Sequence, residues 1–446
     1  MVRRSAAGVG VSDGNGAESV LAPGLEIDYP TESHDVDGAH PARTRRITVR
    51  RILLAVLLLF VAAGAIAYPE RSRFSAQAAD FSRNVIGDEN TARVESWYFA
   101  LDDRVAKVKY RVLGGSTNPF STSAIRVDFV ARTPRTIVYY TGSGAKPPAA
   151  QLTADTLGPT PLQLPKTQVL RDNPEPGEGA WTTAGLPRSN PNDMLMAKTF
   201  IRPDKSRPYA MVGVLLMDAR RIHLNMIAGT GEPGGYRGMK GGGVLPGDAA
   251  SSLLAAWNGG FKGQHGSYGM WIDGREFVPL RNGLATVAVM KDGSIKLGEY
   301  GRDFTRDENT VAVRQNAVLL VDKGEVSRRV GEGNDTWGYV QVNSAEFITW
   351  RSAVGITKEG NLLFAAGNSL SAETLAKALW AAGAYMAMQL DINSPYVLLS
   401  TFTQQPDGTL KADRFMDNMP DSPSRFLKTQ ERDFMYITLD ESHYRY

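Results

Sequence analysis

Cysteine is absent from this chain of 446 residues. Without thiols the protein has no disulfide bonds, no cysteine nucleophile and no zinc site built on thiolates. Histidine is scarce too: of the five histidines, only His223 and His265 lie inside the part of the chain that has the composition of a folded domain. A metal site with several histidine ligands is therefore not expected, and a domain outside the cytoplasm would depend on packing alone for its stability.

A large excess of one charge is also missing. The chain has 50 Lys and Arg residues against 47 Asp and Glu residues, which leaves a net charge of +3. So small an excess gives no electrostatic reason to bind nucleic acid. The hydrophobic fraction of 42% and the charged fraction of 22% are those of an ordinary globular protein, and the length allows one to three domains.

Several nucleotide and hydrolase motifs are missing. No Gly-x-Ser-x-Gly segment occurs, and the segment 229–248, with nine glycines in twenty residues, lacks the spacing of a phosphate-binding P-loop. This segment is interpreted either as a flexible surface loop or as a lid over a site. No loop has the spacing of a calcium-binding motif. Asp322 and Asp391 with nearby carbonyl groups leave a divalent metal open, but no cofactor is expected.

The beginning of the chain changes composition abruptly. Residues 1–50 have few large apolar side chains and are predicted to form a disordered tail. Arginines at its end lead into the run 52–68, which has 17 residues and no charge. As a helix this run would be about 26 Å long, the lower limit for crossing a bilayer. The sequence therefore predicts a transmembrane anchor at 51–68 in a bacterial cell membrane, with the N-terminus in the cytoplasm and the main domain outside.

Two other interpretations of this run stay open. Ala65-Ile66-Ala67 has the small-x-small form of a signal-peptide cleavage site, which would remove the run on export. About fifty residues precede the run, however, which is long for the charged region of a signal peptide. The other interpretation is a helix buried in a soluble core, although the run has no polar face.

The chain beyond the anchor divides into two parts. Residues 69–204 are expected to form a stalk and an extension, with an amphipathic helix at 94–112, a strand in 125–140 and an irregular proline-rich stretch at 145–208. Residues 205–446 have the patterning of a compact domain. We predict an α+β fold for this domain, with a mixed, largely antiparallel sheet and flanking helices.

Local signals predict the elements of the 205–446 domain. Apolar or alternating segments predict strands at 209–217, 221–228, 312–321, 353–356, 362–366 and 385–390. Turns at Asp273-Gly274 and Asp292-Gly293 predict two hairpins. A short helix is expected at 249–257 and a stronger one at 371–382, where Ser371 is the N-cap and Gly383 takes the left-handed position after the helix.

Asp391 is the most informative carboxylate of the domain. It follows an apolar strand and precedes Ile392-Asn393-Ser394-Pro395, a turn-like sequence. Sheets of the α/β type commonly place functional groups where a strand ends. The alternative is an aspartate that only caps its own turn.

Two further segments are candidates for anion binding. Asn258-Gly259-Gly260-Phe261 can present backbone N–H groups in a concave nest, with the asparagine amide as a further donor. Arg351 begins a strand, and its guanidinium can bind a phosphate or carboxylate through two donors. The alternatives are a helix C-cap with a turn for the first segment and a solvated strand-edge arginine for the second.

These segments together resemble a known family. Asn258-Gly259-Gly260-Phe261 resembles the Asn-Gly-Gly-(Phe/Tyr)-Phe motif of the phosphodiester glycosidase family, which includes the enzyme that uncovers mannose 6-phosphate and many exported bacterial proteins. Arg351-Ser352-Ala353-Val354-Gly355 is similar to its Arg-Thr-Ala-(Ile/Val)-Gly strand. The helix at 371–383 and the following segment, which ends at Asp391, resemble a third motif. The resemblance covers roughly residues 205–402.

The resemblance implies hydrolysis of a sugar-1-phosphodiester at its glycosidic bond. It implies catalytic roles for Asp391, Arg351 and His265, and substrate contacts for Asn258, Gly259, Gly260, Asn393 and Trp181. The substrate would be a phosphate-linked glycan or glycopolymer of the cell envelope, and the lipid bilayer would be a second partner through 52–68.

One departure from the family pattern leaves other functions open. The family has Gly-Gly-Gly-Ser after the aspartate, where this chain has Ile392-Asn393-Ser394-Pro395. Glycines in such a turn let the backbone approach a phosphate closely, and proline offers no N–H. The alternatives are therefore a non-catalytic envelope protein that binds glycopolymer, and a structural domain that docks a partner protein.

Overall fold

The computed structural model describes residues 85, 87–114, 118–120, 139–140, 162–188, 194–234, 239–338, 348–392, 394 and 396–440. The chain divides into two units, Met1–Ala63 and Gly64–Tyr446, and all described residues belong to the second. The predicted tail, the apolar run 52–68 and the strand expected in 125–140, apart from its last two residues, lie outside the described residues. Within the described part of the chain, no helix combines the length and the apolar character needed to span a membrane.

An eight-stranded sheet, here called the large sheet, forms the centre of this unit. Its strands are β1 (Tyr139–Tyr140), β2 (Met196–Ile201), β3 (Val212–Met217), β11 (Leu319–Asp322), β12 (Glu325–Ser327), β13 (Thr349–Thr357), β14 (Leu362–Leu370) and β15 (Ala384–Gln389). Their order is β1-β12-β11-β15-β13-β14-β3-β2. Only the β1–β12 pair is parallel, and the other neighbours are antiparallel.

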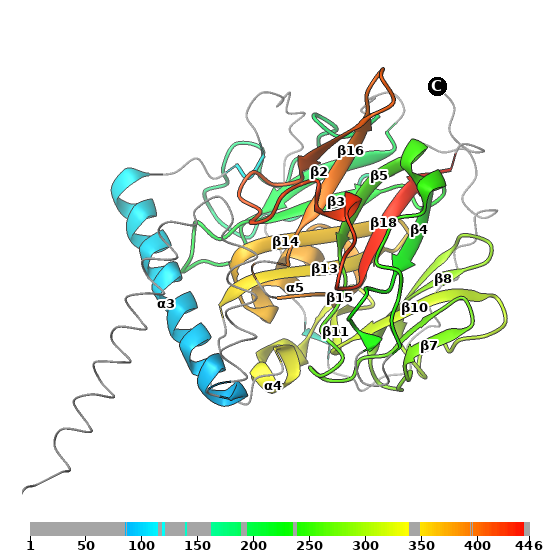
Figure 1. Ribbon diagram of the computed structural model, residues 1–446. Helices are drawn as coiled ribbons and strands as arrows, with labels where there is room; N and C mark the ends of the chain where they lie inside the picture. Colours follow the sequence, from blue (N-terminus) through cyan, green and yellow to red (C-terminus); the bar gives the residue numbers. More distant parts are fainter. Residues whose placement is uncertain are drawn as a thin grey trace, which may run out of the picture. The chain divides into compact units, whose positions relative to one another are not determined.

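Two five-stranded antiparallel sheets accompany the large sheet. The second sheet contains β4 (Ile222–Ile227), β5 (Leu253–Asn258), β16 (Leu399–Gln404), β17 (Leu410–Arg414) and β18 (Phe434–Leu439). The third sheet contains β6 (Met270–Ile272), β7 (Arg275–Val278), β8 (Ala285–Met290), β9 (Ile295–Glu299) and β10 (Thr310–Asn316). The orders are β17-β16-β5-β18-β4 and β7-β6-β10-β8-β9, and Figure 1 shows their arrangement.

Three α-helices and three short 3-10 helices complete the described elements. The α-helices are α3 (Asp88–Leu113), α4 (Asn334–Trp337) and α5 (Ala372–Ala381), and the 3-10 helices are η4 (Gly247–Ser251), η5 (Arg328–Gly331) and η6 (Arg425–Leu427). Helix α5 confirms the prediction at 371–382: the Ser371 hydroxyl accepts from the Thr374 N–H, and Gly383 adopts φ of 93°. Helix α3 includes the predicted amphipathic segment 94–112.

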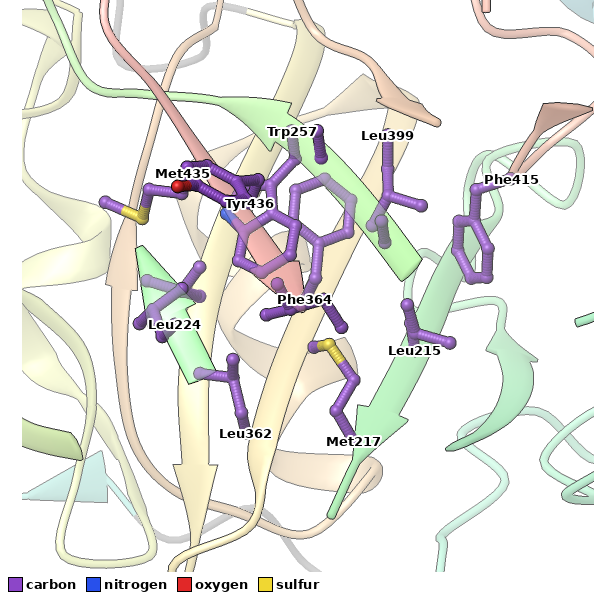
Figure 2. Close-up of a cluster of buried hydrophobic side chains, with 14 of the residues drawn as sticks. Leu215, Met217, Leu224, Trp257, Leu362, Phe364, Leu399, Phe415, Met435 and Tyr436 are labelled. Carbon is purple, nitrogen blue, oxygen red and sulfur yellow. The ribbon is translucent and has the colours of Figure 1, made fainter. Parts of the chain in front are cut away.

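The two faces of the large sheet bury different side chains. In β14, Leu362 and Phe364 belong to a core between the large sheet and the second sheet, which Figure 2 shows together with Trp257 from β5. The alternate residues Leu363 and Ala365 belong to a second core, which includes the buried face of α5. Because both faces are covered, β14 is almost continuously apolar and shows no polar alternation.

Most of the predicted strands are confirmed, although their bounds differ. The hairpins at Asp273-Gly274 and Asp292-Gly293 join β6 to β7 and β8 to β9. The strand expected at 312–321 is two strands, β10 and β11, which lie in different sheets. The fold is therefore a mixed, mostly antiparallel α+β structure, as the sequence predicts.

Two predictions about local structure are wrong. The segment 249–257 is not a helix: η4 ends at Ser251 and β5 follows, with all six of its residues buried between β16 and β18. Leucine and alanine favour helices intrinsically, but burial in the middle of a sheet overrides this weak preference. The proline-rich stretch 145–208 is not irregular throughout, because β2 forms the edge of the large sheet.

Candidate functional site

Asn258 ends β5 at a point where three segments meet. Its Nδ2 donates to Ser352 Oγ at 2.9 Å and to the Gly259 carbonyl oxygen at 3.0 Å. Its Oδ1 accepts a hydrogen bond from the Leu398 N–H at 3.2 Å. The side chain is 2% exposed, so the amide is fully engaged in joining β5, β13 and the chain before β16.

Asp391 is connected to the same point through Ser352. Both the N–H and the hydroxyl of Ser352 donate to the Asp391 carbonyl oxygen, each at 3.0 Å. The Ser352 hydroxyl therefore connects the Asn258 amide to the main-chain carbonyl of Asp391. The Asp391 side chain is buried, and its Oδ1 accepts from the Ile392 N–H at 2.7 Å.

Arg432 is the cation beside Asp391. It lies just before β18, and its Nη2 forms an ion pair with Asp391 Oδ2 and donates to the Gly260 carbonyl oxygen at 3.1 Å. Its guanidinium carbon lies 4.1 Å from the centre of the Tyr396 ring. Burial lowers the pKa of Arg432, but Asp391 and the other acidic groups nearby together outweigh this effect, and the pKa lies above its ordinary value. One guanidinium thus joins the glycine turn at 259–260 to the carboxylate.

A second arginine contacts the other side of this group. The guanidinium carbon of Arg425 lies 5.5 Å from the centre of the Tyr396 ring. Its Nε donates to Gln430 Oε1 at 3.0 Å, and its Nη1 donates to Asp421 Oδ2 at 3.3 Å. Burial lowers the pKa of Arg425, and the nearby charge of Arg432 lowers it further. Two cations therefore share one aromatic ring close to the carboxylate of Asp391.

The glycine turn after Asn258 is held by Asp433. The Gly259 N–H donates to the Asp433 carbonyl oxygen at 3.0 Å, and the Gly260 N–H donates to Asp433 Oδ2 at 3.2 Å. Arg314 Nε donates to the same Oδ2 at 2.8 Å, and its Nη2 donates to the Phe261 carbonyl oxygen at 2.7 Å. Both N–H groups of the predicted nest therefore donate to Asp433, one to its carbonyl oxygen and one to its carboxylate.

Close approach explains why both positions are glycine. A Cβ at position 259 would lie 1.9 Å from Asp433 Oδ2, and one at position 260 would lie 2.9 Å from Arg314 Nη2. Contacts under 3.0 Å force a neighbour to move. The two glycines thus allow the Arg314–Asp433 ion pair to press against the turn.

Arg351 makes its contacts on the helix side of β13. Its Nε donates to the Leu370 carbonyl oxygen at 3.0 Å, and its Nη1 donates to the Trp337 carbonyl oxygen at 3.1 Å and to Gln389 Oε1 at 2.6 Å. Burial lowers its pKa to about 9. Since alternate residues of a strand face opposite sides, Arg351 shares the α5 side with Ala353, and Ser352 faces the side of Asn258. Its predicted role in binding phosphate stays a prediction.

The structure describes two of the three remaining predicted residues, His265 and Trp181. His265 occupies the turn after the glycine segment, where its N–H donates to the Lys262 carbonyl oxygen at 2.9 Å. Trp181 packs against the core on the α5 side, and its Nε1 donates to the Pro165 carbonyl oxygen at 2.9 Å, while its predicted contact with the substrate stays a prediction. Asn393 lies outside the described residues. No cluster of potential metal ligands occurs among the residues that the structure describes.

Sequence reasoning missed Arg432, Asp433, Arg425 and Arg314. One signal was present: Gln430-Glu431-Arg432-Asp433 is a polar group placed directly before the apolar strand 434–439. Such a group at the start of a buried strand is usually interpreted as solvated loop. Only the pairing of β18 with β5 brings this segment next to the glycine turn.

Comparisons with known proteins identify part of the chain. Residues 251–395 match the family model of phosphodiester glycosidase, a span that includes Asn258, Arg351 and Asp391 and ends before Arg432. No curated protein matches the chain.

Three solved structures show similarity to the chain. One is the catalytic domain of zebrafish N-acetylglucosamine-1-phosphodiester alpha-N-acetylglucosaminidase, auto-inhibited by its pro-peptide, at 18% identity and a TM-score of 0.37 over 57% of this chain and 87% of that one. A hypothetical protein from Synechocystis follows at 12% identity and a TM-score of 0.30, over 55% and 62%. The third is a putative exported protein from Burkholderia pseudomallei at 12% identity and a TM-score of 0.29, over 51% and 74%.

Proposed function

We propose that this chain, whose residues 251–395 form a phosphodiester glycosidase domain, hydrolyses sugar-1-phosphodiesters in glycans of the cell envelope. One observation carries the proposal: the ends of β5 and β15 meet in a single buried group, in which Ser352 connects Asn258 to Asp391 and Arg432 connects the glycine turn to the Asp391 carboxylate. This arrangement supports the proposal, because Arg432 contacts both the Asp391 carboxylate and Gly260 of the Asn-Gly-Gly motif.

The proposed reaction breaks the bond between the sugar C1 and the phosphate oxygen. The electron pair of this bond stays with the phosphate, and the oxygen of water bonds to C1, so the products are a free sugar and a phosphomonoester. Asp391 would stabilise the positive charge that develops at C1, as nucleophile, base or electrostatic partner. Because a phosphate leaves readily, little acid assistance is needed.

Arg432 and Arg425 supply positive charge beside this centre. In our proposal the ion pair with Arg432 holds the Asp391 carboxylate in position at this centre. The two guanidiniums also offer a favourable potential for the anionic substrate. Asn258 and the glycine turn would position the phosphate, and His265, Asn393 and Trp181 are proposed to contact the sugar or the leaving group.

The proposed location is the outer side of a bacterial cell membrane. The uncharged run 52–68 would anchor the chain, and the arginines before it would keep the N-terminus in the cytoplasm. The 205–446 domain would then act on phosphate-linked glycopolymer outside the cell.

A second candidate function is binding of the same glycopolymer without turnover. Two observations favour it. The Gly259 and Gly260 N–H groups already donate to Asp433, and Ile392, which stands where the family has glycine, is buried against the α5 side of the large sheet. Both features reduce the backbone donors available to a phosphate.

Hydrolysis of a synthetic sugar-1-(alkyl phosphate) in ¹⁸O-labelled water tests the proposal. We expect free sugar that carries the label and unlabelled alkyl phosphate, whereas label in the phosphate would indicate attack at phosphorus and contradict the proposal. Asp391→Asn should lower the rate by at least about 100-fold, the usual contribution of such a group. Asp413→Asn, in the surface strand β17, should leave the rate unchanged.

Thermal unfolding has to accompany this comparison, because Asp391→Asn leaves Arg432 buried without a carboxylate and lowers stability. Arg432→Lys retains a positive charge but not the planar fork, so we expect a smaller loss of rate than with Asp391→Asn. Binding of the substrate by the wild type with no product would support the second candidate function.

A further inference from the structure

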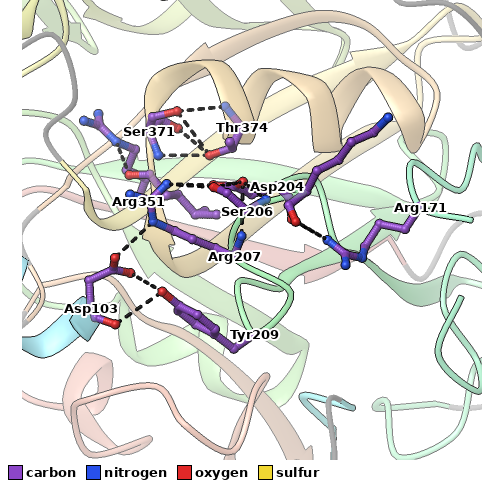
Figure 3. Close-up of polar contacts among 11 residues, drawn as sticks. Asp103, Arg171, Asp204, Ser206, Arg207, Tyr209, Arg351, Ser371 and Thr374 are labelled. Carbon is purple, nitrogen blue, oxygen red and sulfur yellow. Dashed lines mark hydrogen bonds and ion pairs between the residues drawn. The ribbon is translucent and has the colours of Figure 1, made fainter. Parts of the chain in front are cut away.

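Helix α3 is held to the domain by one of its faces. The Asp103 carboxylate accepts from Arg207 Nε at 3.1 Å and from Tyr209 Oη at 2.9 Å, as Figure 3 shows. Seven residues later, which is about two turns of the helix, the ring of Tyr110 lies 6.1 Å from that of Tyr209. These contacts define an inner face of α3 and fix how the helix is rotated about its axis.

The outer face of α3 carries an exposed apolar stripe. Its members are Leu101, Val105, Val108 and Val112, with exposed fractions of 44%, 57%, 59% and 74%. Their spacings of four, three and four residues place them on one side of the helix. At about 100° per residue, Val112 lies about half a turn from Asp103, so the stripe points directly away from the contacts with the domain.

Positive charge borders this stripe. The segment 104–112 contains four lysines and arginines and no acidic residue. Arg104 and Arg111 lie along one edge of the stripe and Lys109 along the other, each three or four residues from a member of it, and all three are exposed. A narrow apolar stripe between cations fits the boundary between acyl chains and anionic headgroups, where long basic side chains reach the phosphates.

A second copy of this chain would fit the stripe less well. The four-three-four spacing is also that of a coiled coil, in which the stripe would occupy the a and d positions. In a parallel pair with this register, Arg104 would occupy a g position and face Lys109 of the partner at the following e position. These like charges repel each other, whereas an anionic surface attracts both.

We propose that the outer face of α3 lies on the surface of an anionic lipid bilayer. The contacts and charges of α3 support this surface, and the predicted anchor at 51–68 would only keep α3 close to the bilayer. The segment 69–87 between the apolar run and α3 has 19 residues, which reach at most about 65 Å when extended, so an anchored chain keeps α3 near the bilayer. The binding surface is independent of the proposed hydrolysis.

The absence of cysteine allows a direct test with the full chain. Val108→Cys and Val112→Cys would each be labelled with a polarity-sensitive fluorophore and reconstituted into phosphatidylcholine vesicles with or without phosphatidylglycerol. Lys411→Cys, at an exposed position of β17, is the matched control. We expect a blue shift and strong quenching by brominated lipid for the two α3 labels in vesicles that contain phosphatidylglycerol, and neither effect for the control.

Reversing the charges beside the stripe distinguishes binding to an anionic bilayer from binding to a second copy of the chain. Arg104→Glu with Lys109→Glu and Arg111→Glu should abolish the blue shift, while circular dichroism verifies that the protein is folded. Labels that stay in water with both lipids would overturn the proposal. A disulfide between two copies at Val108→Cys, with a shift that does not depend on phosphatidylglycerol, would also overturn it and assign the stripe to a second copy. Hydrolysis of a soluble substrate should be unaffected in every case.

Discussion

At the scale of single residues, buried charges organise the candidate site. Asp391, Arg432, Asp433 and Arg314 are all under 9% exposed, and each lies within ion-pair distance of one of the others. Taking charges out of water is costly, so such pairs contribute little to stability on balance. They are better explained as a means of holding specific groups in position, here the glycine turn and a carboxylate.

The close packing at Gly259 leads to the first prediction. Gly259→Ala would place a Cβ 1.9 Å from Asp433 Oδ2, so the ion pair with Arg314 has to move. We expect a loss of about 1–3 kcal/mol in the free energy of unfolding, measured in urea, and a fall in the rate of the proposed hydrolysis. Gly242→Ala is the matched control, because a Cβ there meets nothing within 4 Å. Equal effects of the two substitutions would contradict the proposed role of this contact.

Lys198 gives a prediction about pH. Burial lowers its pKa to about 8, although the charge of Asp417 opposes the shift, and its Nζ lies 4.5 Å from the centre of the Phe120 ring. In the unfolded chain the pKa of Lys198 is about 10.5. Between pH 8 and 10.5 Lys198 is therefore protonated more often in the unfolded chain than in the folded protein. The contribution of Lys198 to the free energy of unfolding should rise with pH across this window.

Comparison with Lys198→Met isolates this effect, because the other groups titrate equally in both proteins. As pH rises from 8 to 10.5, the wild type should gain about 1–3 kcal/mol relative to the variant, with allowance for partial solvent screening. Urea unfolding at both ends of the window measures the difference. If the free energy of unfolding changes equally with pH in the two proteins, the buried lysine is not the cause of the change.

At the scale of elements, successive side chains of β13 face opposite sides of the large sheet and make contacts there with different partners. Ser352 faces the second sheet and connects Asn258 to Asp391, whereas Arg351 faces α5 and connects β13 to Leu370, just before the helix begins. Figure 3 shows Arg351 together with the capping residues Ser371 and Thr374. Neighbouring residues of one motif therefore serve two sides of the large sheet.

The start of α5 provides a prediction at this scale. Ser371 and Thr374 form a reciprocal capping box, with hydrogen bonds of 3.1 Å and 2.9 Å. Ser371→Ala removes the side-chain acceptor and should lower the free energy of unfolding by about 1 kcal/mol, while Ser371→Asp retains an acceptor and should cost less. Chemical denaturation of the three proteins measures this order. A larger loss for aspartate than for alanine would contradict the capping role.

At the scale of the folded unit, the large sheet and the second sheet are joined by one apolar core. Trp257 of β5 is fully buried in it, with its ring 5.7 Å from that of Phe364 of β14 (Figure 2). Among the described residues its indole N–H has no hydrogen-bond partner. The tryptophan therefore contributes apolar area at the cost of an unsatisfied donor.

Substitutions of Trp257 test how much this shared core stabilises the folded protein. Trp257→Ala leaves a large cavity and should lower the free energy of unfolding by about 3–5 kcal/mol. Trp257→Phe retains most of the apolar volume and removes the unsatisfied N–H, so its cost should be clearly smaller. Thermal unfolding distinguishes the two, and a phenylalanine variant as unstable as the alanine variant would show that the N–H is satisfied in solution.

Much of the fold was predictable because its signals are local. Ser371 and Gly383 mark the ends of α5, and Asp273-Gly274 and Asp292-Gly293 mark two hairpins. The segment 253–258 was misjudged, because a continuous apolar run does not distinguish a buried strand from a helix. Its strand state depends on β16 and β18, which lie far along the chain.

The candidate site was predictable only in part. The motifs marked Asn258 and Asp391, and the structure connects them, but the groups that hold them in place come from residues 314 and 432–433. No motif spacing relates these positions to residue 258. Their meeting depends on the register of β18 against β5, which pairs Phe434 with Asn258.

The sequence by itself determined the chemistry that this protein can use and most of its local structure. Without cysteine, thiol chemistry is excluded, and the groups that the motifs mark as candidates are carboxylate, guanidinium and amide. The tertiary structure decided which of these groups meet. Burial selects between strand and helix where propensity is weak, and strand alternation sends Arg351 and Ser352 to opposite faces of one sheet, because both effects depend on partners that are distant in the sequence.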